Sequence, residues 1–159
     1  MSKLITDQSD RVGKWVAPRA HSPVGYGTAG ENYQAVGVEN PDGDLVAGMV
    51  FENYDKHSVV IHLAIEDPKF VHLSFYKYCF QYAFVWMGCQ RMTAMCIDGY
   101  KRNERLLRGM CFTKEGVIRR GWRLPSGEIV DAALYGCLIE ECKLIPKEYR
   151  HASPPLDAT

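Results

Sequence analysis

The feature that most constrains this chain is an apolar helical segment set between two strand-like segments. Asp67 and Pro68 are residue types typical of a helix start, and Gly88 is typical of a helix end. Residues 58–66 before this segment and 91–97 after it have the composition of strands. A strand, a helix and a strand in this order form a crossover unit whose strands are parallel. We therefore predict an α/β fold in which a helix over residues 68–87 is buried deeply against a sheet.

The segment before this unit predicts a β-meander. Residues 33–39 and 45–54 have strand patterns, and the pair Asp42-Gly43 between them is typical of a tight hairpin turn. With residues 58–66, they give three consecutive antiparallel strands.

The segment after the unit predicts a short helix and a hairpin. Asn103 is a residue type that caps helices, and a charged helical stretch follows it. Residues 113–123 and 129–139 then predict a C-terminal β-hairpin with its turn near Gly127. The expected fold class is mixed α/β, with a β-meander, a long buried helix, a short helix and a C-terminal hairpin around one central mixed sheet.

Length and composition indicate one domain with a core of its own. The chain has 159 residues, of which 47% are hydrophobic. We expect this domain to span residues 1–145. Its first 32 residues give the weakest pattern, with a short helix over 10–15, and residues 146–159 have the polar, Pro-containing composition of a flexible tail.

The charge balance bears on the partners. Lys plus Arg and Asp plus Glu both number 19, so the zero net charge argues against nonspecific binding of nucleic acid. Neither a signal peptide nor an uninterrupted apolar membrane span is recognisable. The arginines do gather locally and leave a basic patch open: Arg102, Arg105, Arg108, Arg119, Arg120 and Arg123.

The six cysteines form no CxxC pair and lie within apolar runs. This pattern is typical of reduced, mostly buried thiols in a cytoplasmic protein. A cysteine nucleophile is disfavoured because none of the six has a histidine nearby in sequence. A metal site is also disfavoured, since His57 and His62 lack a third ligand at a suitable spacing.

Gly25, Gly27 and Gly30 match the GxGxxG spelling of a dinucleotide-binding turn. That motif requires a strand before it and a helix after it, and here prolines precede it and a strand pattern follows. We interpret this stretch as a surface loop, which could line a substrate entrance.

An ordered set of residues over the second half of the chain resembles the GNAT superfamily of acyl-CoA-dependent N-acyltransferases, in particular its ribosomal-protein N-acetyltransferase-like branch. The resemblance covers residues 32–142 and implies acetyl-CoA or another acyl-CoA as co-substrate and an amine of a small molecule or protein as acceptor. Two departures stand out: Cys111 replaces a glycine, so we expect a different helix cap, and no glycine occurs in 67–72, where the family binds the CoA pyrophosphate. The set comprises Asn103, Met110-Cys111-Phe112, Glu115-Gly116, Arg119, Gly127, Asp131, Tyr135 and Glu141-Cys142.

The resemblance also implies where the acyl-CoA would bind. The backbone of Leu63, Ala64 and Ile65 would lie beside the acyl carbonyl, and Asn103 would contact the cofactor arm, although Asn103 as a helix cap would not need that role. The helix start that follows would hold the pyrophosphate, because helix N-termini present unpaired N–H groups. Its residues are Lys69, Phe70, Val71 and His72.

Acyl transfer to an amine needs a base for the amine proton and an acid for the leaving thiolate. Strand alternation puts His62 and Glu66 on one side, so either could act as base, and Tyr100 is the candidate acid. The alternative for His62 is a histidine of the core with its hydrogen bonds satisfied, and the alternative for Glu66 is a solvated residue at the end of a strand.

A second function remains open. A GNAT-fold protein that has lost turnover could act as a binding or regulatory module, engaging a protein partner through its arginine-rich surface. The exposed edge strand of the C-terminal hairpin could also pair with a second copy as a homodimer.

Overall fold

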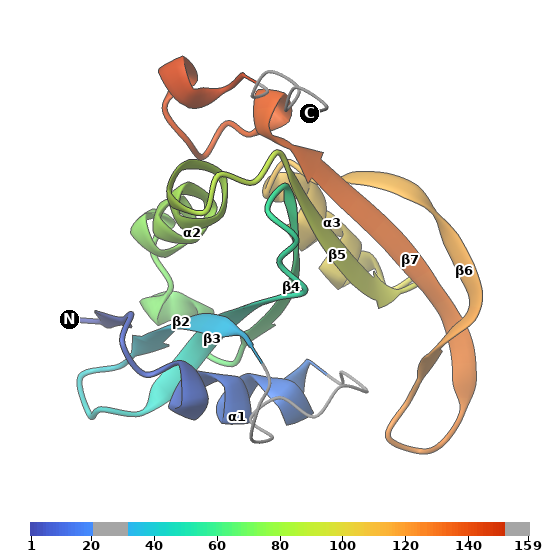
Figure 1. Ribbon diagram of the computed structural model, residues 1–159. Coiled ribbons are helices and arrows are strands. Elements are labelled where there is room, and N and C mark those ends of the chain that lie inside the picture. The colour runs from blue at the N-terminus through green and yellow to red at the C-terminus, as the bar shows by residue number, and fades with distance from the viewer. Residues whose placement is uncertain (21–31, 152–159) are drawn as a thin grey trace.

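The computed structural model describes residues 1–20 and 32–151 and contains one seven-stranded mixed sheet (Figure 1). The strand order is β1-β2-β3-β4-β5-β7-β6. Neighbouring strands are antiparallel except β4 and β5, which are parallel as the crossover unit predicts. The strands are β1 Lys3–Ile5, β2 Gln34–Glu39, β3 Leu45–Glu52, β4 Ser58–Ile65, β5 Arg91–Ile97, β6 Thr113–Arg123 and β7 Ile129–Leu138.

Helices cover the two faces of the sheet (Figure 1). Helix α1, Ser9–Arg19, packs on β2, β3 and β4, and Val12 and Val16 are fully buried there. Gly48 permits this close approach, because a Cβ at that position would lie 2.7 Å from Val16. The opposite face carries the larger core and is covered by α2, Leu73–Gln81, and α3, Lys101–Gly109. We call these the α1 face and the α2 face.

The start of the long helix differs from the prediction. Pro68–Phe70 forms a 3-10 turn, Val71 is extended, and α2 begins only after His72 as N-cap. Asp67 makes no side-chain cap hydrogen bond, and its carboxylate pairs with Lys69 at 3.4 Å instead. The predicted helix start at Pro68 was therefore wrong. The predicted end holds: α2 continues as a π-helical turn, Tyr82–Trp86, and Gly88 follows with φ +75°.

Helix α3 also begins earlier than predicted. Its N-cap is Tyr100, so Asn103 lies in the first turn and the prediction of an Asn103 cap was wrong. Gly99, with φ +81°, turns the chain ahead of the helix, and its N–H donates to Glu104 Oε1 at 3.1 Å. The glutamate therefore binds a backbone N–H ahead of the helix.

The end of α3 is a Schellman motif with cysteine in the left-handed position. Cys111 has φ +70°, its N–H donates to the Arg108 carbonyl at 3.1 Å, and the Phe112 N–H donates to the Leu107 carbonyl at 3.0 Å. The expected different cap is not found: Cys111 adopts the backbone conformation that a glycine would favour.

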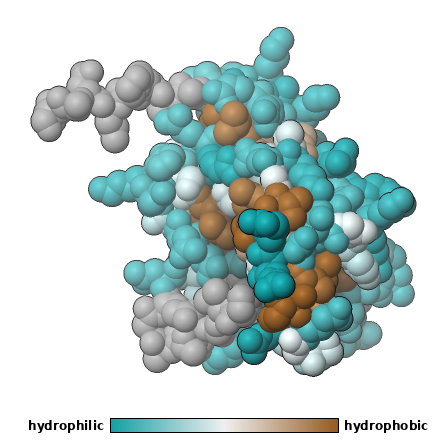
Figure 2. All heavy atoms as spheres, turned by 90° about the vertical axis from the view of Figure 1, so that its right-hand side faces the viewer, coloured by the Kyte–Doolittle hydropathy of each residue, from teal (hydrophilic) through white to brown (hydrophobic). Residues whose placement is uncertain are grey.

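The hairpin of β6 and β7 extends the sheet on one side (Figure 1). Figure 2 faces this side and shows apolar side chains gathered among hydrophilic ones. Val117, Ile118 and Ile129 of the hairpin are exposed, and β6 is an edge strand as expected. Pairing with a second copy stays a prediction.

Several short segments complete the fold. Helix α1 is longer than the predicted 10–15, and β1 was not predicted, because three residues give too little pattern. Within the expected tail, Lys147–Tyr149 forms a 3-10 turn and Arg150 donates to the Ile145 carbonyl at 3.1 Å, which ties the start of the tail to the domain. All six cysteines are free thiols, five of them buried.

Candidate active site

The parallel strands β4 and β5 pair over only three residues and then diverge. The pairs are Ser58 with Arg91, Val59 with Met92, and Val60 with Thr93. Beyond them β4 stays paired with β3 as far as Ile65. We call the space between the diverging strands the gap.

One edge of β4 is left without a strand partner along the gap. The Glu66 N–H donates to the Val46 carbonyl of β3 at 2.8 Å. Because main-chain groups alternate in direction along a strand, the N–H and C=O groups of Leu63 and Ile65 point away from β3, toward the gap. An internal strand edge of this kind can receive an extended ligand.

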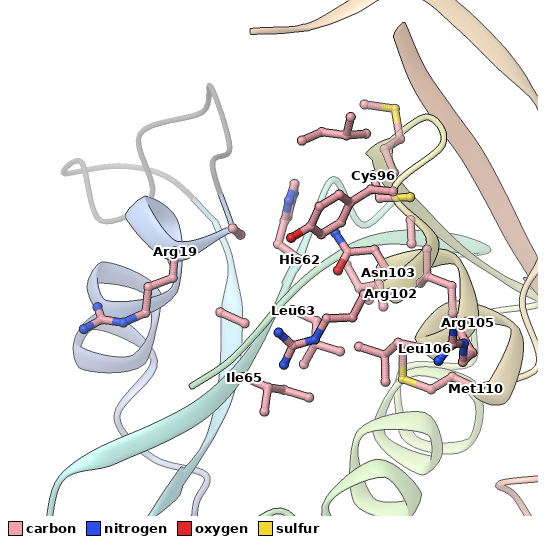
Figure 3. Close-up of a pocket in the computed structure, with 18 of the residues that line it drawn as sticks. Arg19, His62, Leu63, Ile65, Cys96, Arg102, Asn103, Arg105, Leu106 and Met110 are labelled. Atoms are coloured by element: carbon pink, nitrogen blue, oxygen red, sulfur yellow. The ribbon is translucent and has the colours of Figure 1, made fainter. Parts of the chain in front are cut away.

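A cavity of about 1210 Å³ lies at the gap. Its walls come from β4, β5, the start of α2, α3, the C-terminal end of α1 and the end of β6. This volume exceeds the ~300–1,000 Å³ typical of small-molecule sites, so there is room for two ligands. Figure 3 shows Asn103 and Arg102 reaching from α3 toward β4, while the Arg19 guanidinium points away.

The gap connects the two faces of the sheet. Strand partners share a face, so His62, opposite Val50, lies on the α1 face. Met95 and Ile97 of β5 lie on that face too, since Thr93 pairs with Val60 and side chains alternate. The side chains of Leu63 and Ile65 lie on the α2 face. One ligand could therefore approach from each face and meet the other at the gap.

His62 forms a buried pair with Glu52, the last residue of β3. His62 Nε2 lies 2.6 Å from Glu52 Oε1, and the two side chains are only 16% and 10% exposed. A neutral imidazole that donates Nε2–H to the carboxylate carries its lone pair on Nδ1 and can accept a proton there. Sequence reasoning missed Glu52, although a carboxylate at the end of an otherwise apolar strand was a signal.

Glu66 and Tyr100 line the same cavity as His62. Glu66 is 60% exposed and accepts a hydrogen bond from Arg19 Nε at 2.7 Å. The guanidinium of Arg19 also stacks on the Trp15 ring at 4.2 Å. Tyr100 is 52% exposed at the start of α3. The structure thus brings the three candidate catalytic residues to one cavity, with Glu66 held in an ion pair.

The residues expected to bind acyl-CoA fall into two groups. Leu63, Ala64, Ile65 and Asn103 line the cavity. The four residues of the 69–72 stretch do not: Lys69 pairs with Asp67 and lies over the Phe70 ring, and Val71 is also absent from the cavity wall. Phe70 and His72 line a separate hollow of about 130 Å³ near Met1.

The helices α2 and α3 contribute other residues to the cavity wall. Leu73 and Tyr76 of α2 and Arg102 and Arg105 of α3 line the cavity. Sequence reasoning grouped the two arginines with a general basic patch. The signal that they share a site was their spacing of three residues, which places both on one face of a helix.

The cavity wall includes one cysteine, Cys96. Burial, and then the nearby carboxylates of Glu104 and Asp98, raise the pKa of its thiol to about 11. Cys96 is therefore a neutral thiol near pH 7, which disfavours it as a nucleophile. Among residues 1–20 and 32–151, no group of three or more histidine, cysteine or acidic side chains is arranged to hold a metal ion.

The fold matches solved acetyltransferases. A mutant of the spermidine N-acetyltransferase SpeG from Vibrio cholerae aligns with a TM-score of 0.65 at 12% identity, over 87% of this chain and 92% of that chain. A structure described as a probable acetyltransferase aligns with a TM-score of 0.61 at 16% identity, over 86% and 92%. A GNAT-family acetyltransferase from Bacillus anthracis aligns with a TM-score of 0.52 at 22% identity, over 65% of each chain.

These alignments place the chain in a structural class: it has the fold of the GNAT acetyltransferases. The expected fold class is confirmed. No protein-family model matches the sequence, and neither does any curated protein. In the part of the chain that the structure describes, no helix is both long and apolar enough to cross a membrane.

Proposed function

We propose that this protein transfers an acyl group, such as acetyl, from acyl-CoA to a primary amine. The gap between β4 and β5 carries this proposal, because it offers an unpaired strand edge at a place that both faces of the sheet can reach. Acyl-CoA binds from the α2 face and the amine from the α1 face, so that the thioester and the amine nitrogen meet in the gap.

The acyl-CoA side is built from backbone and arginine. The extended arm of CoA hydrogen-bonds to the main chain of Leu63 and Ile65, and Asn103 contacts the arm from α3. Arg102 and Arg105 supply positive charge for the CoA phosphates, which guanidinium groups bind well. Together they replace the glycine-rich turn that the 67–72 stretch lacks.

The chemistry uses the buried pair. The amine nitrogen attacks the thioester carbon, a C–N bond forms and the C–S bond breaks. The proton lost by the amine passes to His62, whose imidazole Glu52 orients and stabilises once charged. The CoA thiolate leaves and takes a proton from Tyr100 or from water. Glu66 is not assigned the base role in this scheme, because its carboxylate is already paired with Arg19.

Binding is tested by calorimetric titration of the purified protein with acetyl-CoA. The Arg102→Ala variant is expected to bind about 10- to 150-fold more weakly, since a charge-assisted contact is worth about 1.5–3 kcal/mol. Arg119→Ala, on β6 and outside the cavity, is the matched control and should bind as the wild type does. If only Lys69→Ala weakens binding, the pyrophosphate lies at the 69–72 stretch instead.

Turnover is tested by thiol release from acetyl-CoA with a panel of amines. His62→Gln is expected to lower kcat by about 10²–10³, in the range of a lost general base. Glu52→Gln should lower it less and shift the pH profile. If the protein binds acetyl-CoA tightly but releases no thiol from it with any amine of the panel, turnover is contradicted and the binding-module alternative is favoured.

A further inference from the structure

Among residues 1–20 and 32–151, the indole N–H of Trp122 finds no hydrogen-bond partner. Trp122 is the last but one residue of β6, is 8% exposed and lines the cavity. Its Nε1 is buried and unpaired. A buried donor without a partner costs about 1–3 kcal/mol, so a buried indole N–H is usually satisfied. A ligand oxygen in the cavity would supply the missing acceptor once a small rotation of the indole brings Nε1 to the cavity surface.

A bulge in β6 fixes the position of this side chain. Ile118 pairs with Ala132 and Trp122 with Val130, so three residues of β6 stand opposite the single residue Asp131. Arg120 in the bulge has φ +54°, and its N–H donates to Asp131 Oδ1 at 2.8 Å. Bulges of this kind redirect a side chain toward a site.

Trp122 lies on the amine side of the gap. Its partner Val130 shares a face with Ala132 and Leu134, which are opposite Ile97 and Met95 of β5. That face is also the face of His62. The side chains of Met95, Ile97 and Trp122, with Leu124 and Pro125 just beyond β6, give this part of the cavity an apolar wall.

The charges of the cavity are unsuited to a polycation. Among the described residues that line it, Glu66 is the only carboxylate, and it is held by Arg19. A polyamine keeps at least one ammonium group when another is acylated, and that group would need an unpaired carboxylate to offset its desolvation.

We propose that the acceptor is a primary monoamine on an apolar body, with a neutral carbonyl oxygen that accepts a hydrogen bond from Trp122 Nε1. This inference rests on the proposed acyl transfer and names its substrate class. Trp122 is then a specificity-determining residue, and the SpeG-like fold here serves an amine unlike spermidine.

The kinetic test compares three amines with acetyl-CoA as donor: phenylalaninamide, 2-phenylethylamine, which lacks the carbonyl, and spermidine. Trp122→Phe keeps an aromatic ring and removes the donor. It should raise KM for phenylalaninamide about tenfold relative to 2-phenylethylamine, with KM for acetyl-CoA unchanged. Trp86→Phe is the matched control, because Trp86 is exposed and outside the cavity; it should leave this ratio unchanged.

A second readout does not require turnover. The protein has three tryptophans, so ¹⁵N-labelled protein gives three indole N–H resonances, and the Trp122→Phe spectrum assigns one of them. With CoA present, phenylalaninamide should shift the Trp122 resonance downfield, and 2-phenylethylamine should not. The Trp86 resonance should stay in place with both.

The outcomes separate the two proposals. Faster acetylation of spermidine than of both monoamines, or an equal effect of Trp122→Phe on both monoamines, overturns the acceptor class and leaves acyl transfer standing. The acceptor class is also overturned if phenylalaninamide leaves the Trp122 indole resonance in place. Failure to bind acetyl-CoA overturns the proposed function, and the indole resonance then still decides whether Trp122 meets the carbonyl probe.

Discussion

An ion pair that crosses over a glycine gives the sharpest test of packing in this fold. Arg91 of β5 donates to both carboxylate oxygens of Glu115 of β6, at 2.9 and 2.5 Å, and Gly136 of β7 lies beneath the pair. A Cβ at position 136 would lie 2.5 Å from Glu115 Oε1 and 2.7 Å from Arg91 Nη1. Gly136→Ala must therefore displace the ion pair.

The expected cost follows from that displacement. Because the two side chains are 28% and 35% exposed, solvent screening limits the loss to about 1–2 kcal/mol. In a Glu115→Ala background the blocking carboxylate is gone and Arg91 can move aside. There Gly136→Ala should be neutral or stabilise by about 0.5–1 kcal/mol, as alanine does for glycine at an unstrained position. The coupling is about 1–3 kcal/mol.

Urea unfolding of the wild type, the two single variants and the double variant, followed by circular dichroism, measures this coupling. In thermal unfolding the single variant Gly136→Ala should lose about 2–8 °C, at about 2–4 °C per kcal/mol for a chain of this size. An equal loss with and without Glu115, within about 0.5 kcal/mol, would refute the reasoning, because the carboxylate would then not be the obstacle.

Two further predictions concern the same side of the molecule. Hydrogen bonds from Arg91, and then its charge, lower the pKa of Glu115, so the stabilisation is complete above the unfolded-state pKa and is lost as pH falls through the lower folded pKa. The stability difference between wild type and Glu115→Gln should shrink below about pH 4 in urea titrations, and a difference constant from pH 7 to 3 would contradict this. Cys111→Gly should stabilise by about 0.5–1 kcal/mol, since it relieves the left-handed strain and loses only a weak 3.4 Å contact from the Lys143 N–H to sulfur. Cys111→Ala, which keeps the strained Cβ, should not raise the urea midpoint.

Six of the seven strands in the described residues were predictable because their signals are local, and only the three-residue β1 was missed. Residues 113–123 were predicted as a strand and form β6, and the turn at Gly127, which has φ +90°, follows from a residue that adopts that conformation freely. The long helix was harder: Asp67 and Pro68 match a helix start locally, yet the α-helix begins at Leu73. The end of this helix was predicted correctly, because Gly88 follows its last turn with a positive φ.

The candidate site was predictable in part. Residues of one strand, such as His62 and Leu63, follow from the order of elements and the resemblance. Glu52 and Trp122 do not. Glu52 meets His62 only through the register of β3 and β4, and Trp122 reaches the cavity only through the bulge in β6. Residues 25–30, with the GxGxxG spelling, lie outside the described residues, and their interpretation stays a prediction.

The gap also bears on aggregation. An open strand edge is normally a template for pairing with other chains, and proteins protect such edges with charges, prolines or covering elements. Here the open edge of β4 lies inside the sheet, between β5 and the helices of the α2 face, rather than at its rim. A slender extended molecule can enter there, while a second polypeptide strand with its side chains would meet those walls. The molecule thus keeps unpaired main-chain N–H and C=O groups on β4 without the risk that another chain pairs with this edge.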